Sequence, residues 1–435
     1  MTQRFPLAEP GGTPGTGGPT GLGGLSGPAS PLGPAHARLT TARSTGRMVG
    51  LVATGVLALG LAAFATIAAT LGGNIEGVDS DALMGGDRPE AIVPEDPDAG
   101  RPLNIVVLGS DARTGASGDL VADGEAGARS DTTMVLHLSG DRTRVEVVSV
   151  PRDSTVDVPA CSTTNGKTTR ELRGVKFNSA FSQGYVAGGD VASGAVCTTT
   201  TLEQLSGVRM DGFVVVDFAG FAGMVQALGG VEVCVPEEVR SPKANNLHLQ
   251  PGIQVLDGPT ALSYARARTG EGLGNGSDLG RIGRQQELVA AMARGVLSKD
   301  LLTDTPALLK FLDAVTSSLT MSSDLASLDK LAGLAYSLRG VSPGNITFMT
   351  VPHATDPANS ANVVWTDEAE LVWDNMANDR PLSTPEEGAS TSPSASPEAT
   401  EGAIEAGTSP APSPSPTVKD AGEEAFTGAD TTSVC

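Results

Sequence analysis

One stretch of the chain, residues 48–73, carries no charged residue and consists mostly of Leu, Ala, Val and Ile. As a helix of ~1.5 Å per residue it would be ~39 Å long, which is enough to cross a hydrocarbon core of ~30 Å. The stretch therefore predicts one transmembrane helix that anchors the chain.

The charges that flank this stretch predict its orientation. Three arginines precede it and three acids follow it: Arg38, Arg43, Arg47, Glu76, Asp79 and Asp81. Positive flanks stay on the cytoplasmic side, so we expect a single-pass cell-membrane protein with a cytoplasmic N-terminus and an extracytoplasmic domain. The alternative is a cleaved signal peptide with its cleavage site at residues 63–65. The long lead before the stretch and the length of its apolar run argue against it.

Composition divides the rest of the chain. Residues 1–47 are rich in Gly, Pro, Thr and Ser and predict a disordered cytoplasmic tail, and residues 74–100 predict an acidic linker. Residues 381–435 are rich in Ser, Pro and Ala and predict a second disordered tail. The extracytoplasmic domain is therefore expected over about 101–380. The formal net charge of −21 excludes a general nucleic-acid binder.

Within residues 101–380, short β-branched runs alternate with helical patterns. We expect strands at 103–109, 132–138, 144–150, 213–217, 231–235 and 346–351. We expect helices at 199–205, 219–228, 259–266, 281–297, 306–319 and 325–338. Strands interleaved with helices predict an α/β fold, a single domain with a central sheet covered on both sides.

Four cysteines fit an exported, oxidising location and allow up to two disulfides: Cys161, Cys197, Cys234 and Cys435. Three pairings are possible, and the sequence does not select one. A buried free thiol is the alternative for Cys234, which lies in an apolar strand pattern. A bond from Cys435 to the domain would bring the end of the tail back onto it.

Acids and arginines stand beside three neighbouring strand patterns. Asp111 and Arg113 follow the first, Asp131 precedes the second, and Arg152 and Asp153 follow the third. Singly, each acid has a structural explanation as a turn cap or a local ion pair. Together, carboxylates suit Mg²⁺ and arginines suit phosphate, so the set predicts a site for a metal and a phosphorylated ligand.

A second cluster places four arginines close together in the sequence of an acidic domain: Arg266, Arg268, Arg281 and Arg284. Arg281 and Gln285 are four residues apart and share a helix face. Asp278 precedes them and has a structural alternative as the N-cap of that helix. A solvated surface would also explain such a cluster, but a multiply charged anion such as pyrophosphate explains it better.

These motifs resemble the LytR-CpsA-Psr family of cell-envelope proteins, of the actinobacterial type. The resemblance rests on NIVVLGSDAR (104–113), RSDT (129–132), SVPRDS (149–154), KFNSAF (176–181), VVDF (215–218), GGV (229–231), ALSYARAR (261–268) and DLGRIGRQQ (278–286). It implies a central mixed β-sheet flanked by helices. It also implies a phosphotransferase that moves a glycopolymer, by its sugar-1-phosphate end, from a polyprenyl-pyrophosphate carrier to a hydroxyl acceptor. The acceptor would be peptidoglycan or a surface glycoprotein.

The resemblance also implies roles for the motif residues. Asp111 and Asp131 would be Mg²⁺ ligands, and Arg152 and Asp111 the catalytic residues. Pyrophosphate would be bound by Arg113, Arg152, Arg266, Arg268, Asp278, Arg281 and Gln285. The general base stays open between Asp111 and Asp153.

Several alternatives remain at this point. Phe218, Phe221, Met224, Val225 and Leu228 share a helical period that suits either a lipid slot or ordinary core packing. The chain could also be a non-catalytic protein that binds polyprenyl-pyrophosphate glycans or regulates the envelope. A third possibility is a pyrophosphatase that hydrolyses the lipid carrier.

Overall fold

The computed structural model describes residues 41–73, 76–86, 88–92, 100–111, 129–273, 278–298, 304–382 and 419–430. Arg113, Cys435, residues 1–40 and residues 383–418 lie outside the described residues. The chain divides into two compact units, Met1–Phe64 and Ala65–Cys435.

Helix α1 covers Thr41–Gly73. Among the residues that the structure describes, none of the helices combines the length and the apolar character that a membrane crossing requires. The anchor over residues 48–73 stays a prediction.

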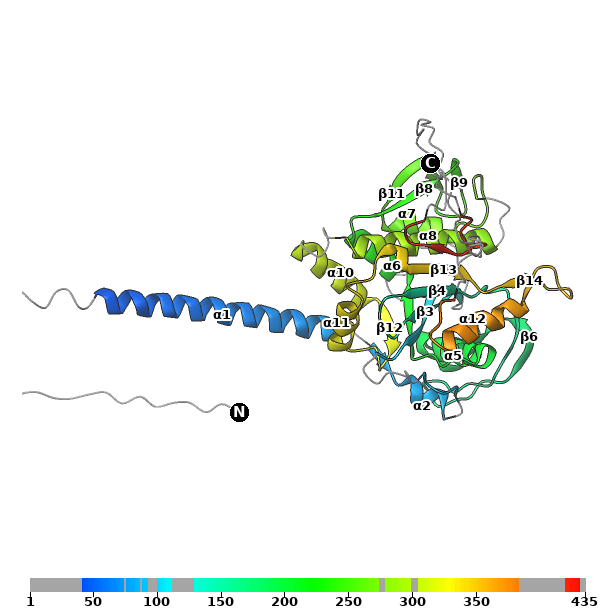
Figure 1. Cartoon of the computed structure of the whole chain (residues 1–435), viewed down its shortest axis with the longest axis horizontal. Coiled ribbons are helices and arrows are strands. Elements are labelled where there is room, and N and C mark those ends of the chain that lie inside the picture. The colour runs from blue at the N-terminus through cyan, green and yellow to red at the C-terminus, as the bar shows by residue number, and fades with distance from the viewer. Residues whose placement is uncertain are drawn as a thin grey trace, which may run out of the picture. The chain divides into compact units, whose positions relative to one another are not determined.

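The second unit is built on a mixed sheet (Figure 1). In spatial order its strands are β1 (Glu76–Val78), β12 (Leu319–Ser322), β7 (Gly212–Asp217), β2 (Leu103–Ser110), β3 (Ser130–Leu138), β4 (Val145–Ser149), β13 (Ile346–Thr350) and β16 (Phe426–Thr427). The pairs β1–β12, β2–β7 and β4–β13 are parallel, and the other neighbouring pairs are antiparallel.

Helices cover both faces of this sheet (Figure 1). One face carries α5 (Val191–Ser206) and α12 (Asp367–Ala377), and α4 (Ser179–Gly188) packs into the same core cluster. The other face carries α6 (Phe218–Ala227), α7 (Gly258–Arg266) and α8 (Asp278–Val296). Successive side chains of β2 point to opposite faces of the sheet. Val106 and Leu108 pack with residues of α5 on one face, and Ile105 packs with Ala290 of α8 on the other. The expected α/β fold with a central mixed sheet is confirmed.

Smaller elements surround the sheet. The remaining helices are α2 (Ser80–Met84), α10 (Thr305–Ser317), α11 (Leu328–Ser337) and a short 3-10 helix, η1 (Pro343–Asn345). Two-stranded sheets pair β5 (Thr155–Val158) with β6 (Leu172–Lys176), β8 (Val231–Val235) with β11 (Gly252–Leu256), β9 (Val239–Ser241) with β10 (Leu247–Leu249), and β14 (His353–Thr355) with β15 (Val363–Trp365). The expected strand 231–235 therefore forms, but in a two-stranded sheet outside the main sheet.

The helix expected at 199–205 begins earlier than its apolar pattern indicates. α5 starts at Val191 because the Asp190 carboxylate caps it, accepting a hydrogen bond of 2.7 Å from the backbone N–H of Ser193. Its first turns contain small residues and Cys197, which is fully buried. Because small side chains contribute little to the hydrophobic periodicity of a sequence, the first turns of α5 do not stand out as helical.

Cys197 is disulfide-bonded to Cys161, with the two Cα atoms 5.5 Å apart. The bond fastens the polar segment 161–169 to α5. Cys234 is disulfide-bonded as well, so the alternative of a free thiol there is wrong.

The C-terminal segment, residues 419–430, corrects the expectation that all of 381–435 is a disordered tail. Phe426 lies in β16, is 2 % exposed and stacks on Phe348 with ring centroids 5.1 Å apart. The Arg294 guanidinium of α8 donates a hydrogen bond of 3.0 Å to the Gly428 carbonyl. This segment extends the edge of the sheet and packs against α8.

Candidate active site

Asp111 stands directly after β2, where the pairing with β3 shifts register between Gly109 and Ser110. Its backbone N–H donates to the Arg129 carbonyl at 3.1 Å, and its Oδ1 accepts from the Arg129 backbone N–H. These two bonds hold Asp111 beside the start of β3. The shift in register, as in a β-bulge, turns the chain at the strand end.

Asp131 contacts three arginines, which together with it form the arginine cluster of the site. Its Oδ1 lies 2.6 Å from Arg152 Nη1, and its Oδ2 lies 2.9 Å from Arg268 Nη2. Its backbone carbonyl accepts a bond of 3.3 Å from Arg281 Nη2. Burial by itself would raise the pKa of Asp131, but the charges of Arg268, Arg152 and Arg281 outweigh burial and lower the pKa below its usual value.

Arg152 links three parts of the chain. It follows β4 and reaches Asp131 of β3 with Nη1, while its Nε lies 3.1 Å from Asp278 Oδ1 of α8. Burial by itself would lower the pKa of Arg152, but the carboxylates of Asp131 and Asp278 raise it above its usual value. The guanidinium is therefore charged and held by carboxylates from two different elements.

The first turn of α8 supplies Asp278 and Arg281, the more buried residues of the arginine cluster. Asp278 is the first residue of the helix and pairs with Arg281 one turn later. The Arg281 side chain is only 3 % exposed, and burial lowers its pKa to about 10. A pKa near 10 still leaves the guanidinium charged at neutral pH. Its Nε has no hydrogen-bond partner among the described residues.

Polar side chains farther along α8 fix the helix against its neighbours. The Gln286 amide donates to Ser149 Oγ of β4 at 2.9 Å and to the Met349 carbonyl of β13 at 3.0 Å. Gln285 Nε2 donates to the Ala265 carbonyl of α7 at 3.4 Å, and Arg284 donates to the Ala267 carbonyl. The arginine-bearing turn of α8 is thereby positioned on the ends of β4 and α7.

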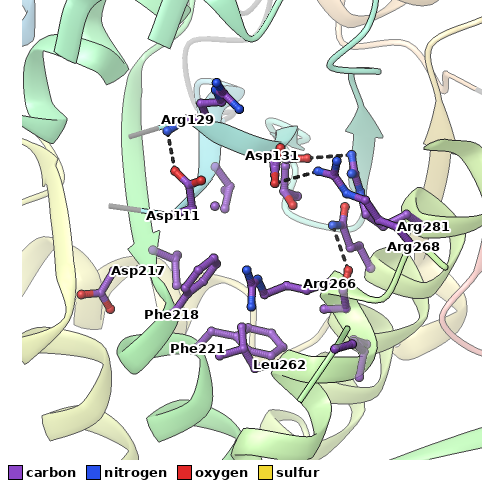
Figure 2. Close-up of a pocket in the computed structure, with 18 of the residues that line it drawn as sticks. Asp111, Arg129, Asp131, Asp217, Phe218, Phe221, Leu262, Arg266, Arg268 and Arg281 are labelled. Carbon is purple, nitrogen blue, oxygen red and sulfur yellow. Dashed lines mark hydrogen bonds and ion pairs between the residues drawn. The ribbon is translucent and has the colours of Figure 1, made fainter. Parts of the chain in front are cut away.

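A cavity of about 560 Å³ opens beside this cluster (Figure 2). Charged residues line one end, including Asp111, Asp131, Arg129, Arg268 and Arg281. Apolar side chains line much of the rest, among them Val107, Phe218, Phe221, Met224, Ala244, Leu262, Leu288 and Met292. In Figure 2 the aromatic rings of Phe218 and Phe221 lie at the end away from Arg129 and Asp131.

Arg266 lies at the boundary between the two ends of the cavity. Its guanidinium is 4.6 Å from the centroid of the Phe218 ring, a cation–π contact. The Asp217 carboxylate caps α6, accepting a bond of 2.7 Å from the Gly220 N–H. The sharp turn from β7 into α6 therefore presents Phe218 to the cavity.

The structure brings together most of the predicted site. Asp111, Asp131, Arg266, Arg268, Arg281 and Gln285 line this cavity, and Arg152 and Asp278 adjoin it through their ion pairs. Arg113 lies outside the described residues. Of the apolar set on α6, Phe218, Phe221 and Met224 line the cavity, whereas Val225 is fully buried in a core cluster.

Two cationic residues that line the cavity were not predicted as site residues. Arg129 lines the cavity and stands two residues before Asp131 in the sequence. That proximity to a predicted site residue was the sequence signal that could have identified it. Lys243 also lines the cavity, but it lies between β9 and β10 and no sequence pattern marks it.

Asp111 and Asp131 were predicted to hold Mg²⁺. No group of three or more ligating side chains occurs in the described parts of the chain, and both oxygens of Asp131 already contact arginines. The two carboxylates fit an ion that takes its other ligands from water and a bound phosphate, which is the usual arrangement for Mg²⁺. They do not make a site closed by protein ligands alone.

The fold and the cavity define a class: an α/β protein with a cluster of arginines and carboxylates at the strand ends, beside a cavity lined largely by apolar side chains. The sequence comparisons agree with this class. The model of the LytR_cpsA_psr family matches residues 68–378, and the chain belongs to this family.

Two relatives from Corynebacterium glutamicum illustrate the relation. The probable cell wall biosynthesis protein LcpB is 33% identical over 63% of this chain and 60% of its own length. The cell wall biosynthesis protein LcpA is 30% identical over 64% of this chain and 55% of its own length. The chain thus spans less than two thirds of the length of either relative.

A relative from Halalkalibacterium halodurans, named polyisoprenyl-teichoic acid–peptidoglycan teichoic acid transferase TagU, is 28% identical over 68% of this chain and 83% of its own length. A solved structure, the LytR-Csp2A-Psr enzyme from Actinomyces oris, is 21% identical and has a TM-score of 0.46 over 70% of this chain and 96% of its own.

Proposed function

We propose that this chain is a phosphotransferase that moves a glycopolymer from a polyprenyl-pyrophosphate carrier to a hydroxyl acceptor of the cell wall. One observation carries the proposal: a single cavity has an arginine–carboxylate cluster at one end and aromatic and aliphatic side chains at the other. A polyprenyl-pyrophosphate glycan has the same division, with a charged diphosphate between an apolar chain and a sugar.

In the proposed reaction, the acceptor hydroxyl oxygen attacks the phosphorus that carries the sugar. A new P–O bond forms, and the bond from that phosphorus to the oxygen bridging the two phosphates breaks. Polyprenyl phosphate leaves with the electron pair, and the hydroxyl proton is released to solvent. The product is a phosphodiester between the glycopolymer and the acceptor.

The arginines are the groups suited to this reaction. Charge grows on the phosphoryl oxygens in the transition state, and preorganised cations stabilise it. Arg152 and Arg268 converge on Asp131 from different elements, and Arg281 reaches the backbone of the same residue. In this proposal Arg152 is the catalytic arginine, and Arg266, Arg268, Arg281 and Gln285 bind the diphosphate. Asp278 positions Arg152 and Arg281.

Magnesium belongs to the proposal as well. Asp111 and Asp131 would hold the ion, which when bound would neutralise charge on the diphosphate oxygens. Asp111 lines the cavity, and the bond from the Arg129 backbone N–H to its Oδ1 orients the carboxylate there.

The membrane and the acceptor complete the proposal. A polyprenyl carrier stays in the bilayer, so an anchor at residues 48–73 would keep the domain at the extracytoplasmic surface. The names of relatives as polyisoprenyl-teichoic acid–peptidoglycan teichoic acid transferases support a cell-wall acceptor. Peptidoglycan is the acceptor that we propose, and a surface glycoprotein is the alternative for the same chemistry.

The test uses the full chain in detergent with Mg²⁺, a short-chain polyprenyl-pyrophosphate oligosaccharide and peptidoglycan fragments or a surface glycoprotein. Mass spectrometry identifies the products. A phosphodiester conjugate that requires Mg²⁺ supports the transferase. Free phosphorylated glycan would instead identify a pyrophosphatase. Donor binding without either product would identify a binding or regulatory protein.

A further inference from the structure

A second cavity, of about 430 Å³, adjoins the arginine cluster. It shares Arg129 and Arg268 with the first cavity, and its other lining residues are Arg152, Asp153, Lys176, Asn178, Ser179 and Ser182. Each of these side chains is polar or charged. This polar lining differs from that of the first cavity, which we call the apolar cavity, although both cavities include Arg129 and Arg268. Its volume lies within the ~300–1,000 Å³ typical of small-molecule sites.

Backbone hydrogen bonds join one wall of this second cavity, the polar cavity, to the segment that carries Arg152. The Phe177 N–H donates to the Ser154 carbonyl at 2.8 Å, and the Asn178 N–H donates to the Arg152 carbonyl at 3.1 Å. The chain from the end of β6 into α4 is thus held directly against Arg152. Any ligand in the polar cavity would lie next to the Arg152 guanidinium.

Several side chains in the polar cavity are available to a ligand. In the described part of the chain, the side chains of Asn178, Ser179 and Ser182 form no hydrogen bond. Lys176 Nζ pairs with Asp153 Oδ1 at 2.7 Å, and the lysine side chain is 41 % exposed. An ammonium, an amide and two hydroxyls offer both donors and acceptors, which suits a ligand rich in hydroxyl groups.

The position of the polar cavity favours one source of such a ligand. In phosphoryl transfer the attacking and leaving oxygens lie roughly in line. If the lipid phosphate leaves toward the apolar cavity, the attacking hydroxyl enters from the other side of the arginine cluster. The polar cavity shares Arg129 and Arg268 with the apolar cavity but none of its apolar side chains.

We infer that the polar cavity is a carbohydrate subsite that takes the sugar bearing the acceptor hydroxyl, with Lys176, Asn178 and Ser182 as its contacts. The inference rests on the proposed function for its role in the reaction. The sugar next to the donor diphosphate has the same chemistry and is the other possible source of the ligand. Lys176 and Ser182 set acceptor specificity in this account, whereas Arg152 acts on the phosphate.

The test combines binding and kinetics on the full chain in detergent. The variants are Ser182→Trp, which fills the cavity, and Lys176→Gln, which removes the ammonium. Arg173→Ala is the matched control, because Arg173 lies on the same strand as Lys176 and is 77 % exposed. The probes are a peptidoglycan disaccharide, measured by NMR titration, and the polyprenyl-pyrophosphate oligosaccharide, measured by its dissociation constant.

We expect wild type and Arg173→Ala to bind the disaccharide, and both cavity variants to bind it at least tenfold more weakly with unchanged donor affinity. In the transfer assay the KM for the acceptor should rise by a similar factor. Weaker donor binding with unchanged disaccharide binding would assign the cavity to the donor sugar and overturn the inference. Unchanged binding of both probes would also overturn it. Because the titration needs no turnover, a failure of the transferase itself would be seen separately.

Discussion

Arg152 Nη1 lies 2.6 Å from Asp131 Oδ1, and this contact joins the segment after β4 to the start of β3. The other oxygen of the same carboxylate lies 2.9 Å from Arg268 Nη2. One acid thus holds two arginines from distant parts of the sequence at a fixed spacing. The proposed diphosphate would meet cations that are already assembled, so little reorganisation would accompany its binding.

Arg152→Lys should lower kcat strongly while donor binding is largely kept. A lysine has a single charged nitrogen and cannot contact both Asp131 and Asp278 as the guanidinium does. Loss of one preorganised donor costs about 10²–10³ in kcat in comparable sites. Steady-state kinetics and donor titration measure the two effects. A kcat within threefold of wild type would show that Arg152 does not stabilise the transition state.

The lowered pKa of Asp131 predicts how its contribution to stability depends on pH. Since the arginines depress the pKa in the folded chain, the ionised carboxylate stabilises the fold above its unfolded pKa of about 3.9. That contribution is lost as the pH falls through the lower, folded pKa. We expect wild type to exceed Asp131→Asn in free energy of unfolding at pH 6, with the gap closing only below about pH 4.

Denaturant unfolding of both proteins between pH 2 and 7 measures this gap. A gap that closes above pH 5 would mean that burial, rather than the arginines, dominates the pKa of Asp131.

Gly283→Ala should disturb the C-terminal segment. A Cβ at Gly283 would lie 2.1 Å from the Ala421 carbonyl oxygen, so the segment must move. In an exposed helix the same change would stabilise by up to about 1 kcal/mol. Here we expect lower stability, faster hydrogen exchange over residues 419–430 and several-fold lower activity, because α8 also carries Arg281.

Gly333→Ala is the matched control, since that helical glycine has nothing within 4 Å of the added Cβ. If Gly283→Ala were as stable as Gly333→Ala, the close packing of the C-terminal segment on α8 would be disproved.

Removal of the Cys161–Cys197 disulfide should destabilise the domain without abolishing the site. The bond closes a loop with a sequence separation of 36, for which loop entropy predicts about 3–4 kcal/mol. Cys161→Ser/Cys197→Ser should therefore unfold at a lower temperature than wild type, while donor affinity at 20–25 °C is retained. Equal melting temperatures, measured by calorimetry, would contradict this prediction.

Much of the site was predictable because its residues follow strands. The apolar runs of β2, β3 and β4 are plain in the sequence, and neighbouring strands bring Asp111, Asp131 and Arg152 to one edge. The arginines of α7 and α8 are marked by their density in an acidic chain. Arg113 was predicted with them and lies outside the described residues.

Other features had no local signal. β16 has two residues and depends on the Phe426–Phe348 stack, which joins segments far apart in the chain. The polar cavity depends on backbone bonds between the Arg152 and Asn178 segments. Periodicity reports which face of an element is apolar, but it does not report which distant element will cover that face.

In the proposed reaction the phosphate moves with the sugar from lipid to acceptor, and an isotopic label tests this transfer most directly. The donor carries ³²P in the phosphate next to the sugar, and the full chain is incubated with Mg²⁺ and peptidoglycan fragments. Arg152→Ala is compared with Arg240→Ala, an exposed arginine paired with Glu238.

We predict that the label appears in the peptidoglycan conjugate with wild type and Arg240→Ala, and falls at least about 100-fold with Arg152→Ala. Label that stays in the lipid pyrophosphate while the sugar is transferred, or that appears only in free sugar phosphate, would contradict the account.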